Sequence, residues 1–184
     1  SNPVLPVFNI FMNNRDHRKI TVVDGKIGYT GGYNLADEYF NITHPYGTWK
    51  DTGIRLVGDA VASLTVTFLQ MWNATAEADN EFQTYFPKLD YRAADAGFVQ
   101  PYADGPLTDG YFAEDVYLNL IKSAKHFFYA ATPYLIISDD MTRELCLAAE
   151  RGVDVRIVTP GIPDKKMVYQ TTRSYYAPLA RRGV

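Results

Sequence analysis

The chain has 184 residues and a formal net charge of −3, with 47% hydrophobic and 21% charged residues. This composition is ordinary for a folded globular protein, and the acidic balance excludes a general nucleic-acid-binding surface. The single cysteine, Cys146, excludes an intrachain disulfide and a cysteine-based zinc site, and its apolar neighbours predict a buried thiol. The longest uncharged run, residues 60–76, is too polar and too short to cross a membrane.

The N-terminal part of the chain is predicted to form a β-hairpin. β-Branched residues favour a strand over residues 19–24, and residues 27–30 favour the returning strand. Asp24-Gly25 is a typical hairpin turn between them. The returning strand ends at Gly31-Gly32, where glycine lets the backbone approach a ligand closely. A loop or a short helix is expected over residues 34–40.

A further strand and a long helix are predicted next. Residues 48–57 favour a strand that places Trp49 and Asp51 on one face. Asp59 is a suitable N-cap for a helix that extends from Ala60 to about Ala76. Apolar residues repeat at helical spacing along it and predict its buried face, namely Val61, Leu64, Phe68 and Trp72.

The remaining sequence is predicted to be a linker followed by a second organised half. Residues 77–112 have weak periodicity, several Gly and Pro residues and an acidic excess, which favour a linker. Helices and strands then alternate, which is typical of an α/β fold with a parallel core. The predicted elements are a helix over 114–124, a strand over 126–132, a helix over 139–151 with Asp139-Asp140 as its N-terminal cap and Gly152 as its C-cap, a strand over 153–158 and a helix over about 165–180.

The residues with the clearest chemistry lie at the start of the hairpin. In strand periodicity His17 and Lys19 point to the same face. An imidazole beside an ammonium suits a phosphate ester, because the imidazole can attack phosphorus while the ammonium holds the anionic oxygens. The alternative is an edge strand that carries scattered polar residues. The bases gathered over residues 151–184 suit either anionic lipid head groups or a solvated helix face.

The spacing of these residues resembles the signature of the phospholipase D superfamily. That signature is His-x-Lys, four residues, Asp, six residues, and then Gly-Gly/Ser-x-Asn, and it is matched here by His17, Lys19, Asp24, Gly31, Gly32 and Asn34. The flanking segments narrow the resemblance to bacterial cardiolipin synthases. They are Asn13-Asn14-Arg15, the run from Gly31 to Tyr39, Trp49-Lys50-Asp51-Thr52, Thr132-Pro133-Tyr134 and the run from Gly152 to Ile157.

The resemblance implies a two-step transfer through a phosphohistidine, without a metal or another cofactor. It implies that His17 is the nucleophile or the acid/base, and that Lys19, Asn34 and the Gly31-Gly32 backbone hold the phosphate. Asp24 is carried over as a catalytic-motif residue whose role in the family is mainly local support. Asp51 lies where the family often has a carboxylate that bonds a catalytic histidine and fixes its tautomer.

The chain departs from the family in carrying one such motif where cardiolipin synthases have two. His44 and His126 lack the pattern and are expected to be structural or exposed. The opening Ser1-Asn2 suggests a piece of a larger protein. We therefore expect residues 1–76 to be the end of a first phospholipase D-like lobe, residues 77–112 a linker, and residues 113–184 the start of a second lobe. The expected fold is α/β, with a mixed sheet flanked by helices.

The start of lobe two is expected to stand in for the missing start of lobe one, within one chain or by exchange between two chains. A two-fold homodimer would then rebuild a site with two histidines. The resemblance implies that the parent enzyme makes cardiolipin from two molecules of phosphatidylglycerol at the bacterial cytoplasmic membrane, whereas this segment is itself expected to be soluble. The alternatives are a phosphodiesterase acting on phospholipid or nucleic acid, and an inert folded fragment. The acidic composition argues against nucleic acid as a partner.

Overall fold

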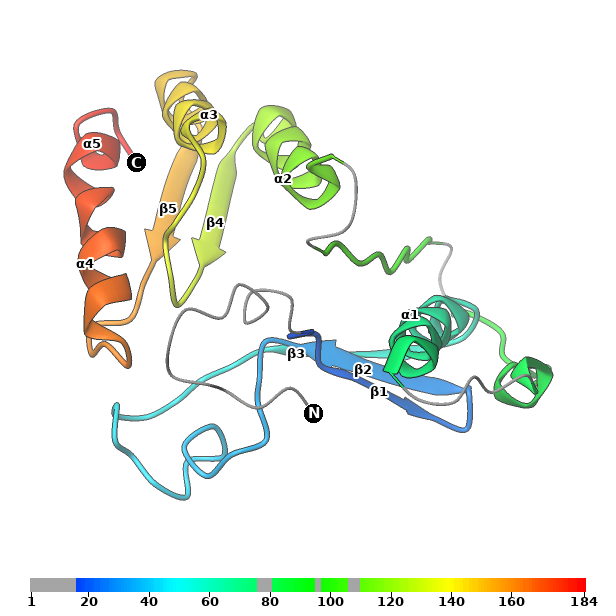
Figure 1. The fold of residues 1–184 in the computed structure, drawn as a ribbon. Coiled ribbons are helices and arrows are strands. Elements are labelled where there is room, and N and C mark those ends of the chain that lie inside the picture. Colours follow the sequence, from blue (N-terminus) through cyan, green and yellow to red (C-terminus); the bar gives the residue numbers. More distant parts are fainter. Residues whose placement is uncertain (1–15, 76–80, 95–96, 106–109) are drawn as a thin grey trace. The chain divides into compact units, whose positions relative to one another are not determined.

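The computed structural model describes residues 16–75, 81–94, 97–105 and 110–184, and its described part is an α/β protein (Figure 1). The flanking segment Asn13-Asn14-Arg15 and the predicted helix end at Ala76 lie outside the described residues. The chain divides into two units, one of Ser1–His44 with Thr48–Thr108 and one of Pro45–Gly47 with Asp109–Val184. The α/β class is confirmed, and the strands form two separate sheets rather than one mixed sheet.

The first unit contains a three-stranded antiparallel sheet. Its strands are β1 (Ile20–Val23), β2 (Ile27–Gly31) and β3 (Gly53–Val57), in the order β1-β2-β3. The predicted hairpin turn is confirmed, because Asp24 and Gly25 have φ angles of 53° and 64° and the Lys26 N–H donates to the Val23 carbonyl at 3.0 Å. Two consecutive positive φ angles give a turn whose twist matches that of the strands.

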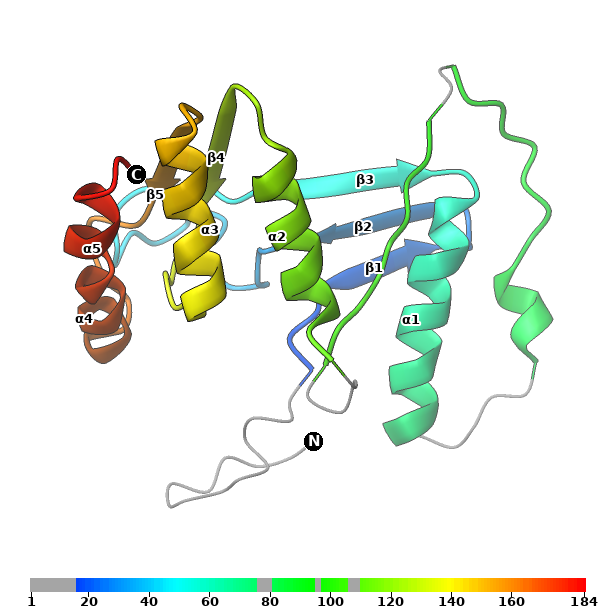
Figure 2. The ribbon, with the colours of Figure 1, turned by 90° about the horizontal axis from the view of Figure 1, so that it is seen from above.

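Helix α1 (Ala60–Thr75) packs across one face of this sheet (Figure 2). Val61, Leu64 and Leu69 are its buried apolar residues. The approach is close at Gly28, where a Cβ atom would lie 2.7 Å from Cδ1 of Leu64. The sheet therefore admits the helix at this distance only because β2 has no side chain there.

The predicted buried face of α1 is half correct. Phe68 and Trp72 follow the same spacing as Val61 and Leu64, yet they are 44% and 49% exposed. Their rings stack at a centroid distance of 6.0 Å, with an interplanar angle of 21°. The sheet has only three short strands, and the second half of α1 buries Leu69 in place of the two aromatic rings.

The strand predicted over residues 48–57 is shorter than expected, since β3 begins at Gly53. The physical reason lies in the backbone of Trp49. Its N–H donates to Oδ1 of Asn41 at 2.6 Å, and its carbonyl accepts from Nδ2 of Asn41 at 2.8 Å. A backbone whose donor and acceptor are both bound by a side chain has none left for a strand ladder at that residue.

Part of the predicted linker packs on the first unit. It contains a short 3-10 helix, η2 (Phe82–Tyr85). The Tyr85 carbonyl and Cδ of Pro87 each lie 2.5 Å from the position of a Cβ atom on Gly25, and the Tyr91 ring lies 2.9 Å from that of Gly58. These segments therefore cover the hairpin turn and Gly58, two residues before α1.

The second unit is an α/β layer with a parallel strand pair. Its elements are α2 (Phe112–Ser123), β4 (Phe127–Ala131), α3 (Asp139–Glu150), β5 (Asp154–Val158), α4 (Lys166–Ser174) and α5 (Tyr176–Ala180). Helix α3 lies over one face of β4 and β5, with α2 and α5 on either side of it (Figures 1 and 2). The core buries eight apolar residues, including Cys146 at 1% exposure, so the predicted buried thiol is confirmed.

Two helix ends in this unit differ from the prediction. The N-cap of α3 is Ser138, whose Oγ accepts from the Met141 N–H at 3.1 Å, and Asp139 and Asp140 lie in the first turn. The helix predicted over 165–180 is divided at Tyr175. Pro178 lacks the N–H that would bond the carbonyl of Ser174, so a continuous helix is disfavoured there. The predicted C-cap glycine, Gly152, has a φ of 92°.

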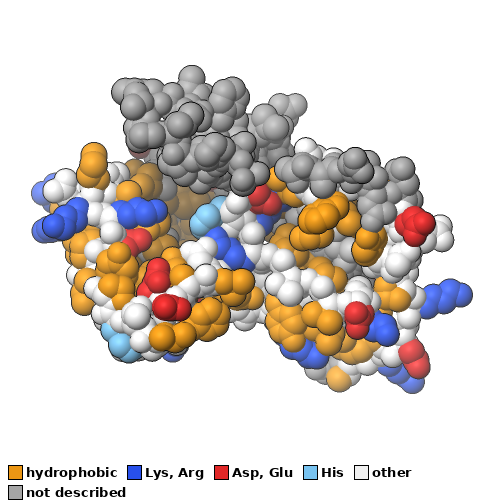
Figure 3. Space-filling view, turned by 60° about the horizontal axis from the view of Figure 1, so that its bottom comes forward, with side chains coloured by type: hydrophobic (Ala, Val, Ile, Leu, Met, Phe, Trp, Pro, Cys, Tyr) orange, Lys and Arg blue, Asp and Glu red, His pale blue; other side chains and the backbone are white. Residues whose placement is uncertain are grey.

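Many large apolar side chains remain exposed on the described parts of both units, and hydrophobic side chains occupy much of the face drawn in Figure 3. On β4 and β5 the residues that alternate with the core positions are open, with Phe127 and Val158 more than 60% exposed. Among the described residues, no helix has both the length and the apolar character needed to span a bilayer.

Candidate functional site

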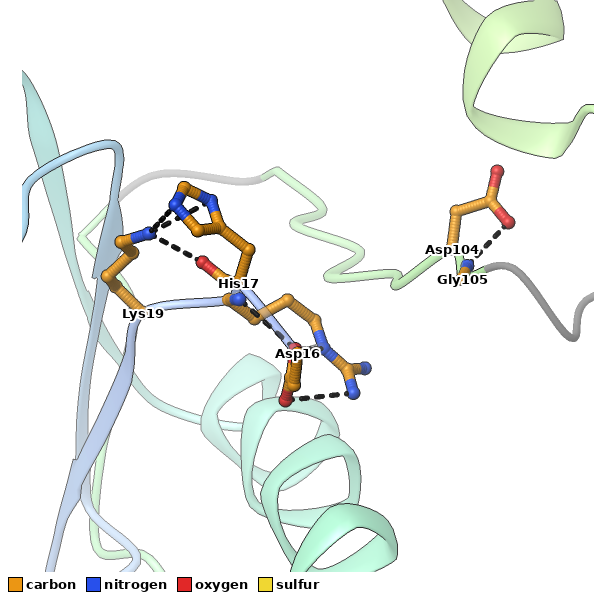
Figure 4. A network of polar contacts seen from close by, with 6 residues as sticks. Asp16, His17, Lys19, Asp104 and Gly105 are labelled. Carbon is orange, nitrogen blue, oxygen red and sulfur yellow. Dashed lines mark hydrogen bonds and ion pairs between the residues drawn. The ribbon is translucent and has the colours of Figure 1, made fainter. Parts of the chain in front are cut away.

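His17 and Lys19 lie immediately before β1, in the first unit. The structure brings their side chains together (Figure 4). The Lys19 Nζ atom is 3.0 Å from Nδ1 and 2.9 Å from Nε2 of His17, and it donates to the His17 carbonyl at 2.7 Å. His17 is exposed and Lys19 is half-buried. The pair therefore presents an accessible imidazole with a cation against it.

The position of the ammonium leaves the imidazole available for chemistry. Near-equal distances to the two ring nitrogens mean that Nζ is aligned with the lone pair of neither. Burial lowers the pKa of Lys19 from its usual value, while the charges of Asp16 and Asp51 act in the opposite direction. An anionic ligand that replaced water here would be favoured by this partly desolvated cation.

Asp16 and Arg18 alternate with His17 and Lys19, and they pair with each other. Nε and Nη2 of Arg18 donate to the two carboxylate oxygens of Asp16 at 2.7 and 3.2 Å. The hydrogen bond from Arg18 holds the pKa of Asp16 below its usual value. The pair keeps the Asp16 carboxylate occupied in the segment that carries His17 and Lys19.

The glycine pair at the end of β2, Gly31-Gly32, lies where two other parts of the unit come close. A Cβ atom on Gly31 would be 2.5 Å from the Thr52 carbonyl and 2.8 Å from the Tyr33 ring. One on Gly32 would be 2.9 Å from Oδ1 of Asp51. A larger residue at position 31 would displace the backbone at Thr52, whereas one at position 32 would have to move only the Asp51 carboxylate.

Asn34 and Asp24 occupy different positions relative to this pair. Asn34 is half-buried in the loop that follows the glycines. Asp24 is an exposed turn residue at the far end of β1, five positions along the chain from Lys19. At about 3.3 Å per residue that is roughly 16 Å, so the structure does not bring Asp24 to the His17–Lys19 pair.

Asp51 lies in the segment that precedes β3, and both of its carboxylate oxygens have donors. Oδ1 accepts from the Thr52 N–H at 2.8 Å, and Oδ2 accepts from the Trp49 indole N–H at 3.4 Å. Asn41 holds the Trp49 backbone, as described above. Sequence reasoning missed Asn41, and the one signal available was its residue type, because asparagine tolerates the positive φ of 56° that it adopts.

The two other histidines are exposed, as predicted. His44 lies in the first unit, and His126 lies in the second unit just before β4, where its carbonyl accepts from the Asp154 N–H at 3.0 Å. Across the described ranges of the chain, no three His, Cys, Asp or Glu side chains converge as metal ligands would.

Comparisons with known proteins fit this arrangement. Residues 117–184 match the family model described as "Cardiolipin synthase, PLD-like domain". The chain is 44% identical over 183 residues to an uncharacterized protein of Streptococcus mutans. It is 40% identical to the cardiolipin synthases of Alkalihalophilus pseudofirmus and Staphylococcus aureus, with 98% of this chain aligned to each. The chain is thus similar to bacterial cardiolipin synthases along nearly its whole length.

The resemblance to cardiolipin synthases extends over both units of the chain. The family model covers part of the second unit, from α2 to the last residue, while the alignments to the two synthases also include the segment with His17 and Lys19. The chain spans 36% of each of these synthases and 40% of the Streptococcus mutans protein. The relatives therefore contain more than half of their length outside the region compared.

Proposed function

We propose that this chain supplies the first of two phosphate-transfer motifs in an enzyme that makes cardiolipin from two molecules of phosphatidylglycerol. The contact between the Lys19 ammonium and the His17 imidazole carries the proposal. It sets a nucleophile beside an anion-binding group at the start of β1, in the sequence spacing of the phospholipase D superfamily. The names of two 40% identical relatives support the same substrate class.

In the proposed first step a ring nitrogen of one histidine attacks the phosphorus of phosphatidylglycerol. The bond from phosphorus to the head-group glycerol oxygen breaks, and that oxygen takes a proton from a second histidine. The product is a phosphatidyl-histidine. Lys19, Asn34 and the backbone at Gly31-Gly32 stabilise the negative charge that builds on the non-bridging oxygens.

In the second step the hydroxyl of another phosphatidylglycerol gives its proton to the second histidine and attacks the same phosphorus. The phosphorus–nitrogen bond breaks, which releases cardiolipin and restores the imidazole. His17 fills one of the two histidine roles. Asp51 is proposed to keep the site electrostatically balanced by countering Lys19, in line with its effect on the pKa of Lys19.

The second histidine is proposed to come from a matching motif in the part of the enzyme that corresponds to the remaining length of its relatives. The shares of 36% to 40% support this arrangement, because a second lobe fits within that length. A second copy of this chain is the other source, and a two-fold dimer would place two such motifs face to face.

The proposal is tested with phosphatidylglycerol in detergent micelles, comparing this chain with the whole enzyme. We expect cardiolipin and free glycerol from the whole enzyme, and a loss of about 10³-fold or more in His17→Ala. Lys19→Met should lose a similar factor, while His44→Ala is the matched control and should retain activity. Phosphatidic acid as the product would instead indicate hydrolysis. Turnover that survives His17→Ala would contradict the proposal.

A further inference from the structure

We propose that Asn41 is a positioning residue of this site, acting through Trp49 to hold the Asp51 carboxylate against Gly32. This inference rests on the proposed function for its meaning, because it assigns Asn41 a part in a phosphate-transfer site. The contacts themselves lie within the first unit.

The first link is the contact between Asn41 and the Trp49 backbone. The Asn41 amide uses both its donor and its acceptor on one residue, with Nδ2 donating to the Trp49 carbonyl at 2.8 Å and Oδ1 accepting from the Trp49 N–H at 2.6 Å. Both bonds are partly buried. Two bonds from one planar amide fix the direction of the Trp49 peptide units as well as their distance.

The Asn41 backbone adopts a left-handed conformation in this loop. Its φ of 56° is one of two positive values among the non-glycine residues of the described ranges, the other being that of Asp24 in the hairpin turn. Most residues other than glycine, asparagine and aspartate adopt this left-handed conformation only with steric strain. The loop therefore places at position 41 a residue that tolerates left-handed backbone and also carries an amide.

The second link runs from Trp49 to Asp51. The indole ring packs edge-on against the Tyr39 ring, with centroids 4.6 Å apart at 62°. Its N–H then points at Oδ2 of Asp51 at 3.4 Å, while the Thr52 N–H holds Oδ1 at 2.8 Å. Asp51 is exposed, so the Trp49 indole N–H and the Thr52 N–H, rather than close packing, set the direction of its carboxylate.

The third link joins Asp51 to the site. Its Oδ1 lies 2.9 Å from the position that a Cβ atom on Gly32 would take. Its charge also favours the protonated form of Lys19, against the effect of burial. Without the hydrogen bond from the Trp49 indole, the Asp51 carboxylate would turn toward water. The protonated form of Lys19 would then lose part of the stabilisation that the Asp51 charge provides.

Position 41 allows the amide to be removed without adding backbone strain. Asn41→Gly deletes both bonds and keeps a residue at ease with positive φ, whereas Asn41→Ala deletes the same bonds and adds strain. The two variants therefore separate the effect of the amide from that of backbone destabilisation. Asp51→Asn and the double variant Asn41→Gly/Asp51→Asn complete a thermodynamic cycle.

Two NMR signals report the outcome without turnover. The chain has two tryptophans, so the Trp49 indole N–H is readily assigned, and the Lys19 ε-carbon follows its titration. We expect Asn41→Gly and Asn41→Ala to move the indole signal in the direction of Asp51→Asn. Each should lower the pKa of Lys19 toward its value in Asp51→Asn, and the double variant should match Asp51→Asn alone.

The proposal would be overturned if the shifts in the double variant were the sum of those in the two single variants. It would also be overturned if Asn41→Gly lowered stability but left the Trp49 indole and Lys19 signals unchanged. If Asn41→Gly does not fold, Trp49→Phe removes the indole donor and keeps an aromatic ring against Tyr39, and it must lower the pKa of Lys19 in the same way. If the NMR shifts are as expected but the whole enzyme has no transferase activity, the positioning role of Asn41 is supported and the proposed function is rejected. If the enzyme is active but the NMR shifts are not as expected, the proposed function is supported and the positioning role of Asn41 is rejected.

Discussion

The two units of the chain differ in how they are held together and in what they carry. In the second unit eight buried apolar residues from α2, α3, β5, α5 and the adjoining segments form one core. In the described part of the first unit the buried apolar side chains are Val61, Leu64 and Leu69, all from α1. Yet the first unit holds the His17–Lys19 pair and the glycines beside Asp51.

The difference shows that the candidate chemistry is built from backbone geometry and polar contacts more than from a packed core. Glycines admit close neighbours at Gly28, Gly31 and Gly32, and one asparagine amide organises the segment before β3. A site of this kind depends on a few specific hydrogen bonds, whereas the second unit depends on volume and burial. Substitutions in the two units should therefore have separable effects.

The largest effect on stability is expected from Leu145→Ala in α3. Leu145 is 3% exposed in the core of the second unit, and such a deletion costs about 2–5 kcal/mol. Thermal unfolding followed by circular dichroism measures the loss, with Leu120→Ala as the matched control, because Leu120 is 55% exposed on α2. The His17 ring signals should stay unchanged in the folded variant. A shift of the His17 signals would show that a substitution in the second unit affects the first, against the prediction of separable effects.

The next effect is expected from Gly28→Ala in β2. The new methyl group would lie 2.7 Å from Cδ1 of the buried Leu64, so the Leu64 side chain, α1 or the sheet must move. Overpacking of this kind costs about 1–3 kcal/mol. Denaturant unfolding provides the measurement, and Gly97→Ala is the control, since no atom lies within 4 Å of its added Cβ. Equal stabilities for the two variants would disprove the close approach of α1.

A smaller loss is expected from Ser138→Ala at the start of α3. The Ser138 hydroxyl accepts from the Met141 N–H and donates to the carboxylate of Glu114, and loss of an N-cap costs about 1 kcal/mol. Ser123→Ala serves as the comparison, because its hydroxyl donates to the Asn119 carbonyl within α2 and caps no N-terminus. A larger loss in Ser123→Ala, measured by the same unfolding assay, would reject the capping assignment.

The smallest effect concerns the Asp16–Arg18 pair and pH. The pKa of Asp16 is lower in the folded chain than its usual value of 3.8. Its contribution to stability is thus present above pH 3.8 and is lost as pH falls through the folded pKa. Both side chains are about 30% exposed, so we expect less than about 1 kcal/mol. Acid titration of Asp16→Asn should show a shallower loss of stability below pH 4, and Arg18→Gln should match it. If the variants lose stability below pH 4 as steeply as the unsubstituted chain, the Asp16–Arg18 pair does not contribute to stability.

The sequence predicted the local features that depend on local chemistry. The turn at Asp24-Gly25, the start of α1 at Ala60 and the parallel pairing in the second half follow from residue preference and periodicity, and the structure confirms them. The contact of His17 with Lys19 agrees with the expectation from strand periodicity that residues two apart share a face. Spacing alone predicts such features because the relevant neighbours are close in sequence.

The features that escaped prediction depend on partners distant in sequence. The exposure of Phe68 and Trp72 reflects how little sheet there is for α1 to cover, and periodicity does not report that. The late start of β3 reflects the hydrogen bonds that Asn41 makes to the backbone of Trp49, eight residues after it. Asp51 was selected from a family pattern, but its indole and amide donors became apparent only in the structure.

The most direct test of the central claim is a titration of this chain with inorganic phosphate, followed at the histidine ring signals by NMR. The chain has three histidines, so each signal is readily assigned by substitution. If His17 and Lys19 form a phosphate-transfer site, the His17 signals will shift with a saturable dependence on phosphate, and Lys19→Met will abolish the shift. His44 and His126 will stay in place. An unmoved His17, or equal shifts at all three histidines, would contradict the account.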